Sequence, residues 1–382
     1  MIRTFHPIGQ GAFYTERHTM SDSKEFTIVY DCGSGTQAKI SKPMSKKIVS
    51  AFPNNHVIDV LFISHFHSDH INGIEALKEH CDIKKVIIPL IDEETKILIN
   101  VDNVISRNLL SKIDFQTELL DNPSNLFGND RVITVKELLP TEGRNDTINL
   151  ENNININELS DIKEIDSGTA LKLLKNDNNE WLFIPLNYKH NLRALLFEKA
   201  LTKRGLSFKD IDTLDKIIAK RKKIKEAYKE INADLNKHSL ILFSGIKPIN
   251  KGADYIKHVM HSQIYHCCLF SDLYCPCLRN SPCGCLYLGD IDLNQENIVS
   301  DIQNRLNLVF QNIGTIQMPH HGSIDSFNSN ILEASMQCAI FSYGTNNPFG
   351  HPSDRVIEYA VEKGLIPLFV TEQKETIVIQ MK

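Results

Sequence analysis

The sequence contains no apolar run close to the roughly 20 residues that a membrane helix needs. It also contains a single tryptophan. Residues 1–6 lack the apolar stretch of a secretory signal peptide. We therefore expect a cytoplasmic protein that does not enter a membrane. The formal net charge of −5 argues against a protein that coats nucleic acid, although a local basic patch is compatible with it.

Apolar residues make up 42 % of the 382 residues, as in an ordinary globular protein. The length exceeds the usual size of a single core, but the motifs described below are spread over nearly the whole sequence. We therefore expect one elaborated domain over residues 1–382. Short apolar runs typical of strands alternate with stretches of helical periodicity, which fits two sheets flanked by helices.

The most informative segment is the run Ser64-His65-Phe66-His67-Ser68-Asp69-His70, which directly follows the apolar residues 60–63. Histidine and aspartate are ligands that a divalent cation such as zinc prefers. Because residues two apart in an extended segment face the same way, His65 and His67 can share one ion. Asp69 and His70 lie beyond the turn and can hold a second. A loop that is merely histidine-rich is the alternative, and the order His-x-His-x-Asp-His argues against it.

This order resembles the signature of the metallo-β-lactamase-fold superfamily, whose members are mostly dinuclear metal hydrolases. Other segments resemble the soluble hydrolase domain of ComEC-type proteins, namely Gly9-Gln10-Gly11, Asp31-Cys32-Gly33, Gly289-Asp290, His320-His321-Gly322-Ser323 and His351-Pro352. The resemblance implies an α+β fold, an αββα four-layer sandwich. It fails over a divergent middle region at 93–235, in which the spacing of apolar residues predicts a helical insertion at 192–235. ComEC-type proteins are membrane channels for DNA uptake, and that transport role does not carry over to a chain resembling only their hydrolase part.

The resemblance also implies which side chains hold the two metals. His65 and His67 match the ligands of the first ion, and Asp69 and His70 match those of the second. Asp290, at the end of an apolar run, matches the carboxylate that bridges both ions. Asp69 is in addition expected to hold the attacking water through its second oxygen, which makes it a candidate catalytic residue.

Two positions of this ligand set stay open. His321 matches the late histidine of the second site, and His320 is the alternative. Where many members carry a third histidine at the first site, this sequence has Asn236, with His238 as the alternative. Loss of an imidazole at that place would weaken the first site and favour manganese over zinc.

Two further residues are expected to act next to the metals. Asp31 ends a predicted strand and is a candidate partner for the free N–H of a metal-bound imidazole. His351 is a candidate catalytic residue that donates a proton to the leaving group or pairs with a developing anion.

A cysteine-rich hairpin is expected over residues 266–285. Two Cys-x-Cys pairs lie in it, Cys275 with Cys277 and Cys283 with Cys285. Four thiolates at this spacing can hold a structural zinc ion. The spacing is tighter than the usual Cys-x-x-Cys, and two alternatives to a zinc site therefore stay open. The cysteines can serve as small apolar residues of a hairpin, or they can have a redox role.

The ComEC-type resemblance favours a phosphodiesterase or nuclease that acts on DNA or RNA with two zinc or manganese ions. A small nucleotide is the first alternative substrate. A small lactone, ester or amide is the second, and it predicts a compact apolar pocket. A non-catalytic metal-binding regulatory protein is the third. The basic residues 220–225 fit a solvated helix face better than a nucleic-acid contact, because no aromatic side chains are interleaved with them. Partner proteins of a defence or DNA-processing system are expected by analogy.

Overall fold

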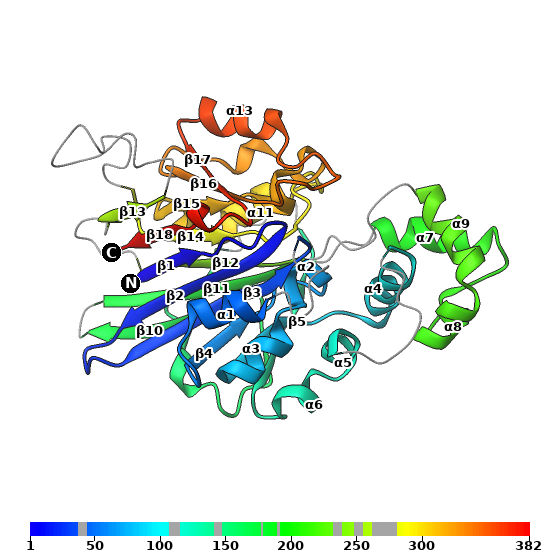
Figure 1. Ribbon diagram of the computed structural model, residues 1–382, viewed down its shortest axis with the longest axis horizontal. Helices are drawn as coiled ribbons and strands as arrows, with labels where there is room; N and C mark the ends of the chain where they lie inside the picture. Colours follow the sequence, from blue (N-terminus) through cyan, green and yellow to red (C-terminus); the bar gives the residue numbers. More distant parts are fainter. Residues whose placement is uncertain are drawn as a thin grey trace.

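Two β-sheets face each other, and helices cover the outer surface of each sheet (Figure 1). The computed structural model describes residues 1–36, 44–106, 115–140, 147–176, 179–188, 192–231, 239–247, 255–261 and 281–382. The layers follow the order helix, sheet, sheet, helix, so the predicted αββα fold class is confirmed. No helix in these ranges is long and apolar enough to cross a lipid bilayer.

The first sheet has nine strands within the described ranges. In spatial order they are β13 (His258–Met260), β18 (Val378–Met381), β1 (Ile2–Phe5), β2 (Gly11–Thr19), β3 (Glu25–Ser34), β4 (Val57–Phe62), β5 (Asp82–Pro89), β6 (Val132–Val135) and β9 (Glu164–Ile165). Strands β3 to β6 are parallel, so their carboxyl ends meet at one edge. Strand β18 pairs with β1, which brings both ends of the chain into this sheet.

The second sheet is built in a similar way from the later part of the chain. In spatial order its strands are β17 (Ile366–Val370), β16 (Cys338–Ser342), β15 (Ile313–Gln317), β14 (Gly284–Tyr287), β12 (Ser239–Ile246), β11 (Asn179–Tyr188), β10 (Ala170–Asn176) and β8 (Asn153–Asn155), and β7 (Glu137–Leu138) pairs with β11. Strands β14 to β17 are parallel. Each sheet therefore provides one group of parallel strands whose carboxyl ends can carry functional side chains.

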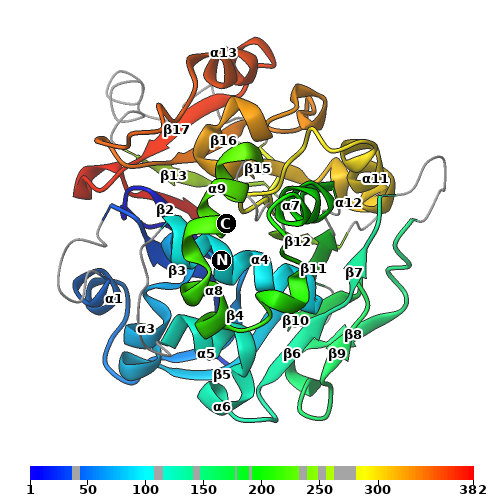
Figure 2. The same ribbon diagram turned by 90° about the vertical axis from the view of Figure 1, so that its right-hand side faces the viewer.

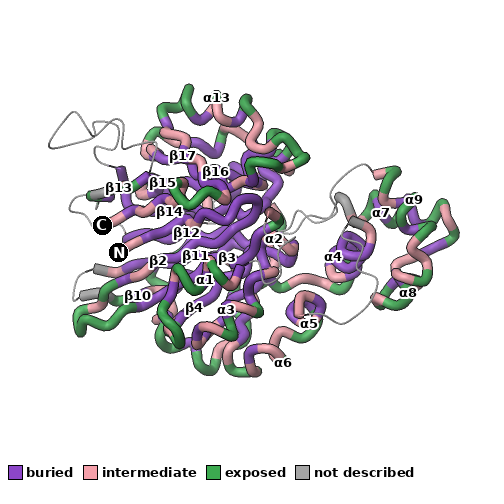
Figure 3. Tube along the Cα trace, viewed as in Figure 1, coloured by how far each residue is buried: buried purple, intermediate pink, exposed green. Residues whose placement is uncertain are grey.

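Apolar side chains fill the three spaces between the four layers, and the strands are accordingly buried (Figure 3). Against the first sheet lie α1 (Ser45–Ala51), α3 (Ile74–His80), α5 (Phe115–Asp121) and α6 (Pro123–Phe127). Against the second lie α11 (Ile298–Arg305), α12 (Asn307–Phe310) and α13 (Asp354–Glu362). The 3₁₀ helices are η2 (Ile156–Glu158), η3 (Phe208–Asp210), η5 (Pro319–Gly322), η6 (Ile324–Ser326), η7 (Ser329–Ile331) and η8 (Lys374–Thr376).

A fourth apolar cluster lies outside the sandwich and joins α4 (Glu93–Ser106) to α7 (Leu192–Thr202), α8 (Leu214–Ala219) and α9 (Arg221–Ile231). We call α7, η3, α8 and α9 the helical cap. In Figures 1 and 2 the cap covers the end of the sandwich at which the short helix α2 (Ser68–Ile71) lies, with α4 between them.

Residues 192–231 thus include the helices expected over 192–235. In α9, Ile224 and Ala227 are buried whereas Lys222, Lys223 and Lys225 are exposed, as in a solvated basic face. That this region is an insertion, and that residues 1–382 form one domain, remain predictions.

Candidate metal centre

The candidate ligands lie after the carboxyl ends of strands in both sheets. Strand β4 of the first sheet is followed by His65 and His67, and then by α2, which carries Asp69 and His70. In the second sheet, Asp290 follows β14. His321 lies in η5, which follows β15. Because parallel strands end at the same edge, residues far apart in the sequence come together at one end of the sandwich.

The six side chains form two groups, and within each group the ligand atoms lie within 4.8 Å of one another. The first group is His65, His67 and Asp290, and the second is Asp69, His70 and His321. Asp290 lies between them, since its Oδ1 is 3.2 Å from His70 Nε2 and its Oδ2 is 3.6 Å from His65 Nε2. His321 Nε2 lies 3.3 Å from Asp69 Oδ2 and 3.8 Å from Asp290 Oδ2.

These distances suit side chains that share an ion. Most of them exceed a normal hydrogen bond, but two ligands that are each about 2.0–2.2 Å from a zinc ion lie up to about 4.2 Å apart. The Nε2 atoms of His65, His70 and His321 are buried and have no hydrogen-bond partner among the described residues, and the same holds for Asp290 Oδ1. Buried polar atoms of this kind call for an unseen partner. The nitrogen and carboxylate donors therefore fit divalent metal ions.

The charges at the centre also favour cations. Burial opposes ionisation of Asp290 and Asp69, but the neighbouring imidazoles outweigh it and hold the pKa of both carboxyl groups well below the ordinary value. Burial lowers the pKa of His65 to about 4, helped by the nearby His70, so that this imidazole is neutral and able to bind a metal. For His70 burial acts in the same direction, but Asp290 and Asp31 raise its pKa well above the ordinary value.

Three of the four histidines, His65, His70 and His321, are oriented through their other ring nitrogen. His70 Nδ1 lies 2.8 Å from Asp31 Oδ2, and the Asp31 carboxylate also accepts hydrogen bonds from the backbone N–H and the hydroxyl of Ser64. The Ser64 hydroxyl lies 2.8 Å from His65 Nδ1. His321 Nδ1 lies 2.9 Å from the carbonyl oxygen of Ser342. Such partners fix the tautomer and the direction of a ligating imidazole. The contact of Asp31 with His70 is compatible with the role expected of Asp31, which stays a prediction.

The side chains of His320 and His321 point in different directions because of the backbone at this turn. His320 and His321 both have left-handed backbones, with φ of 48° and 59°, a conformation that is costly for residues other than glycine. This turn directs His321 into the second group. His320 instead contacts the hydroxyl of Ser326 at 3.1 Å and lies beside the ring of His351, 5.5 Å between centroids.

Two motif glycines let backbone segments approach the centre closely. At Gly11, with φ of 131°, a Cβ atom would lie 2.2 Å from the carbonyl oxygen of Asp69. At Gly289, with φ of 55°, it would lie 2.1 Å from Ser239 Oγ, the hydroxyl that accepts a hydrogen bond from the Asp290 N–H. A side chain at either position would displace a loop that carries a candidate ligand.

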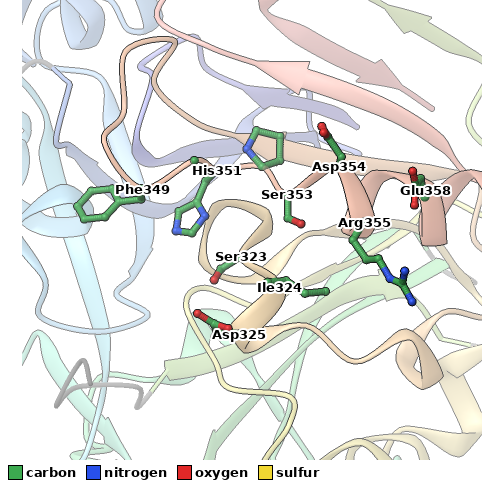
Figure 4. A pocket seen from close by; sticks show the side chains of 11 residues that line it. Ser323, Ile324, Asp325, Phe349, His351, Ser353, Asp354, Arg355 and Glu358 are labelled. Carbon is green, nitrogen blue, oxygen red and sulfur yellow. The ribbon is translucent and has the colours of Figure 1, made fainter. Parts of the chain in front are cut away.

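Beside the centre, on the side of His320, lies an open pocket of about 580 Å³ (Figure 4). His351 lines it, and its ring lies nearly parallel to that of Phe349, with 5.8 Å between centroids. Burial and the nearby His321 lower the pKa of His351. The free side chain is therefore mostly neutral at pH 7, which suits a hydrogen-bond donor better than a cationic partner for an anion. The lining residues are Ser323, Ile324, Asp325, Phe349, Gly350, His351, Pro352, Ser353, Asp354, Arg355 and Glu358.

Several predicted residues cannot be placed. Asn236, His238, Cys275 and Cys277 lie outside the described residues, so the roles expected of them stay predictions. The other cysteine pair is described. Both Cys283 and Cys285 are buried in the core between the sheets, and Cys285 is part of β14. Burial raises the pKa of Cys285 to about 12, which disfavours the thiolate that zinc requires.

One carboxylate next to the centre was not predicted from the sequence. Asp102 of α4 is buried, and its Oδ2 lies 3.8 Å from His67 Nε2. No motif marks it, because a single aspartate in a helix of ordinary composition carries no metal signal.

The comparison with known families agrees with this geometry. A family model described as the metallo-β-lactamase superfamily matches residues 21–99, from β3 through the histidine-rich loop into α4. Over these residues the chain is similar to the metallo-β-lactamase superfamily. No curated protein matches the chain. Among solved structures it is similar to a long form RNase Z from yeast, with 8 % identity and a TM-score of 0.28. That match covers 83 % of this chain but only 32 % of the RNase Z chain, and a likeness this weak carries no argument about the substrate.

The contact between Asp31 and His70 gives a first prediction. We expect Asp31→Asn to weaken metal binding at the second group by about 10- to 100-fold, because the neutral amide no longer holds the imidazole as a carboxylate does. Asparagine tolerates the left-handed backbone of this residue, φ 58°, so the change tests the carboxylate and not the turn. Competition with a chromophoric chelator measures the effect. Asp59→Asn, on β4 of the same sheet, is the control, and equal affinities in the two variants would contradict the prediction.

Proposed function

We propose that this protein is a metal-dependent hydrolase that cleaves phosphodiester bonds in nucleic acids or nucleotides. The observation that carries the proposal is the pair of ligand groups with Asp290 between them, in which the buried Nε2 atoms of His65, His70 and His321 have no hydrogen-bond partner among the described residues. Two bound divalent ions would lower the pKa of a water molecule between them and polarise the oxygen next to the bond being broken. Zinc and manganese both suit nitrogen and carboxylate donors.

The side chains around the ions have distinct tasks. His65, His67 and Asp290 would hold the first ion, and Asp69, His70 and His321 the second. Asp69 is half-buried, unlike the other ligands, so its carboxylate can also accept a hydrogen bond from the attacking water. His351, on the pocket side, would donate a hydrogen bond to the substrate oxygen that departs.

The pocket supports a polar substrate over a small apolar ester. Most of its lining side chains are hydroxyl, carboxylate, imidazole or guanidinium groups, and Arg355 provides a cation in it (Figure 4). Phe349 is 67 % exposed, and an exposed ring beside a catalytic centre can stack on a nucleobase. The ComEC-type resemblance points to the same class of substrate. A compact apolar pocket, as expected for a lactone or ester, is not what adjoins the described part of the centre.

A cleavage assay tests the proposal. The purified protein is incubated with plasmid DNA, single-stranded DNA, RNA and bis(p-nitrophenyl) phosphate, with zinc or manganese added. We expect metal-dependent cleavage that Asp69→Ala lowers by more than about 100-fold, beyond the usual effect of changes outside the ligand set. Asp82→Ala, which removes a half-buried carboxylate at the start of β5, should leave the rate unchanged.

A fully metallated protein that cleaves none of these substrates but hydrolyses a lactone or thioester would overturn the phosphodiesterase assignment. Cleavage that is equal in the Asp69→Ala and Asp82→Ala variants would trace the activity to a contaminant and overturn the assignment as well.

A further inference from the structure

The two ligand groups differ in negative charge. The second group contains Asp69 and lies next to Asp290, whereas among the described residues the first group has Asp290 as its single carboxylate. An ion at the first group would therefore be held by two neutral imidazoles and a carboxylate that it shares with the other ion. A divalent ion in a buried site favours further anionic or polar ligands on its open side.

Asp102 lies next to His67 of the first group. Its Oδ2 is 3.8 Å from His67 Nε2, the ring nitrogen that belongs to the first group, and its side chain is 8 % exposed. Its other oxygen, Oδ1, accepts a hydrogen bond of 2.7 Å from the hydroxyl of Tyr228 on α9. A buried carboxylate with one oxygen fixed in this way presents the second in a defined direction.

The surroundings of Asp102 indicate that this part of α4 faces a site. Residues 97–104 of α4 are buried throughout, and Ile97, Leu98, Val101 and Val104 pack in the cluster shared with the cap (Figure 3). The same stretch also contains Asn100 and Asn103, each of which has a buried side-chain oxygen without a hydrogen-bond partner in the part of the chain that the structure describes. Buried polar atoms without a hydrogen-bond partner, on a stretch of helix that is otherwise apolar, indicate that a water molecule or an ion binds there.

We propose that Asp102 is an additional anionic residue of the first metal site, positioned by Tyr228 of the helical cap. Asp102 is not part of the group whose ligand atoms lie within 4.8 Å of one another, so it is not one of the close ligands. It acts instead as an outer carboxylate that helps to retain the ion and the water bound to it. The cap is thereby tied to the metal centre through Tyr228, Asp102 and His67. This assignment rests on the proposed dinuclear centre, but not on the identity of the substrate.

Metal binding, and not activity, tests the assignment. Divalent ions bound per chain are counted by elemental analysis after dialysis against graded chelator concentrations, in the full-length protein and in variants. We expect the wild type to hold two ions at the centre, and Asp102→Asn to lose one of them at a roughly 10- to 100-fold lower chelator concentration. Tyr228→Phe should shift the same ion in the same direction by a smaller factor. Glu94→Gln, an exposed carboxylate on α4, is the matched control.

Thermal unfolding separates this role from a structural one. With excess chelator, Asp102→Asn and the wild type should unfold at similar temperatures, whereas added metal should raise the unfolding temperature of the wild type more than that of the variant. Equal ion affinities in the wild type and in Asp102→Asn would overturn the assignment, as would a loss of stability that is the same with and without metal. A wild-type protein that binds fewer than two ions at the centre would overturn the dinuclear proposal itself, together with the role of Asp102.

Discussion

Asp290→Asn is expected to remove both ions from the centre, a larger loss than any other single change in the ligand set. Its carboxylate is the one group that lies near both ligand groups, within 3.2 Å of His70 Nε2 and 3.6 Å of His65 Nε2. Asparagine keeps the size of the side chain, but it lacks the negative charge that two divalent ions share. We expect metal content to fall from two ions to fewer than one, and hydrolysis to fall by more than about 100-fold.

The backbone at this residue should be unaffected, since Ser239 Oγ accepts the hydrogen bond from the residue 290 N–H whatever the side chain. Asp292→Asn is a matched control, because it is a buried aspartate of the same loop that belongs to neither ligand group. Elemental analysis and the rise in unfolding temperature on adding metal measure the effect. Two tightly bound ions in Asp290→Asn would contradict a centre bridged by this residue.

How much of the centre was predictable depends on how its residues are distributed in the sequence. His65, His67, Asp69 and His70 form a contiguous pattern whose spacing alone indicates a metal site, and the structure brings them together. Asp290 and His321 could be named only by resemblance, because each is a single residue more than 200 positions later. Their approach depends on β14 and β15 ending at the same edge as β4, which no local pattern shows.

Asp102 could not have been predicted from the sequence. In α4 it lies among polar and apolar residues, next to Asn103, as a solvent-facing aspartate would, and it is the packing of the cap on α4 that buries it beside His67. The cysteines illustrate the opposite difficulty. Cysteine serves equally as a metal ligand and as a small apolar residue, and the buried position of Cys285 in the core is compatible with the second role. The fold class was easier, because apolar periodicity over many strands and helices is a property of the whole chain.

A second unpredicted feature is a network of buried polar groups between the sheets. Arg3 of β1 and Glu16 of β2 form an ion pair of 2.7 Å, and both side chains are fully buried. Arg3 also donates hydrogen bonds to the carbonyl oxygen of Cys283 and to the side-chain oxygen of Gln380, 3.1 Å each. Although burial opposes ionisation, Arg3 and His18 hold the pKa of Glu16 well below the ordinary value. The guanidinium thus links β1, β14 and β18 across the core.

Arg3→Met is therefore expected to lower the free energy of unfolding by about 3–5 kcal/mol, because it leaves Glu16 as a buried charge without its cation. Urea denaturation measures the change. Lys84→Met is the matched control, since it removes an exposed cation from its pair with Asp82 and should cost at most about 1 kcal/mol. An equal effect of the two substitutions would contradict the prediction.

The double variant Arg3→Met/Glu16→Leu separates the missing cation from lost packing. If the cost of Arg3→Met comes from the unpaired carboxylate, removing that carboxylate should restore part of the stability, because an apolar pair of similar volume often replaces a buried ion pair at little cost. Ser244 and Tyr287, which donate hydrogen bonds to Glu16, would then lose their acceptor, so the recovery should be incomplete. A double variant that is less stable than Arg3→Met would instead show that Glu16 stabilises the fold through these two hydroxyl groups more than through the arginine.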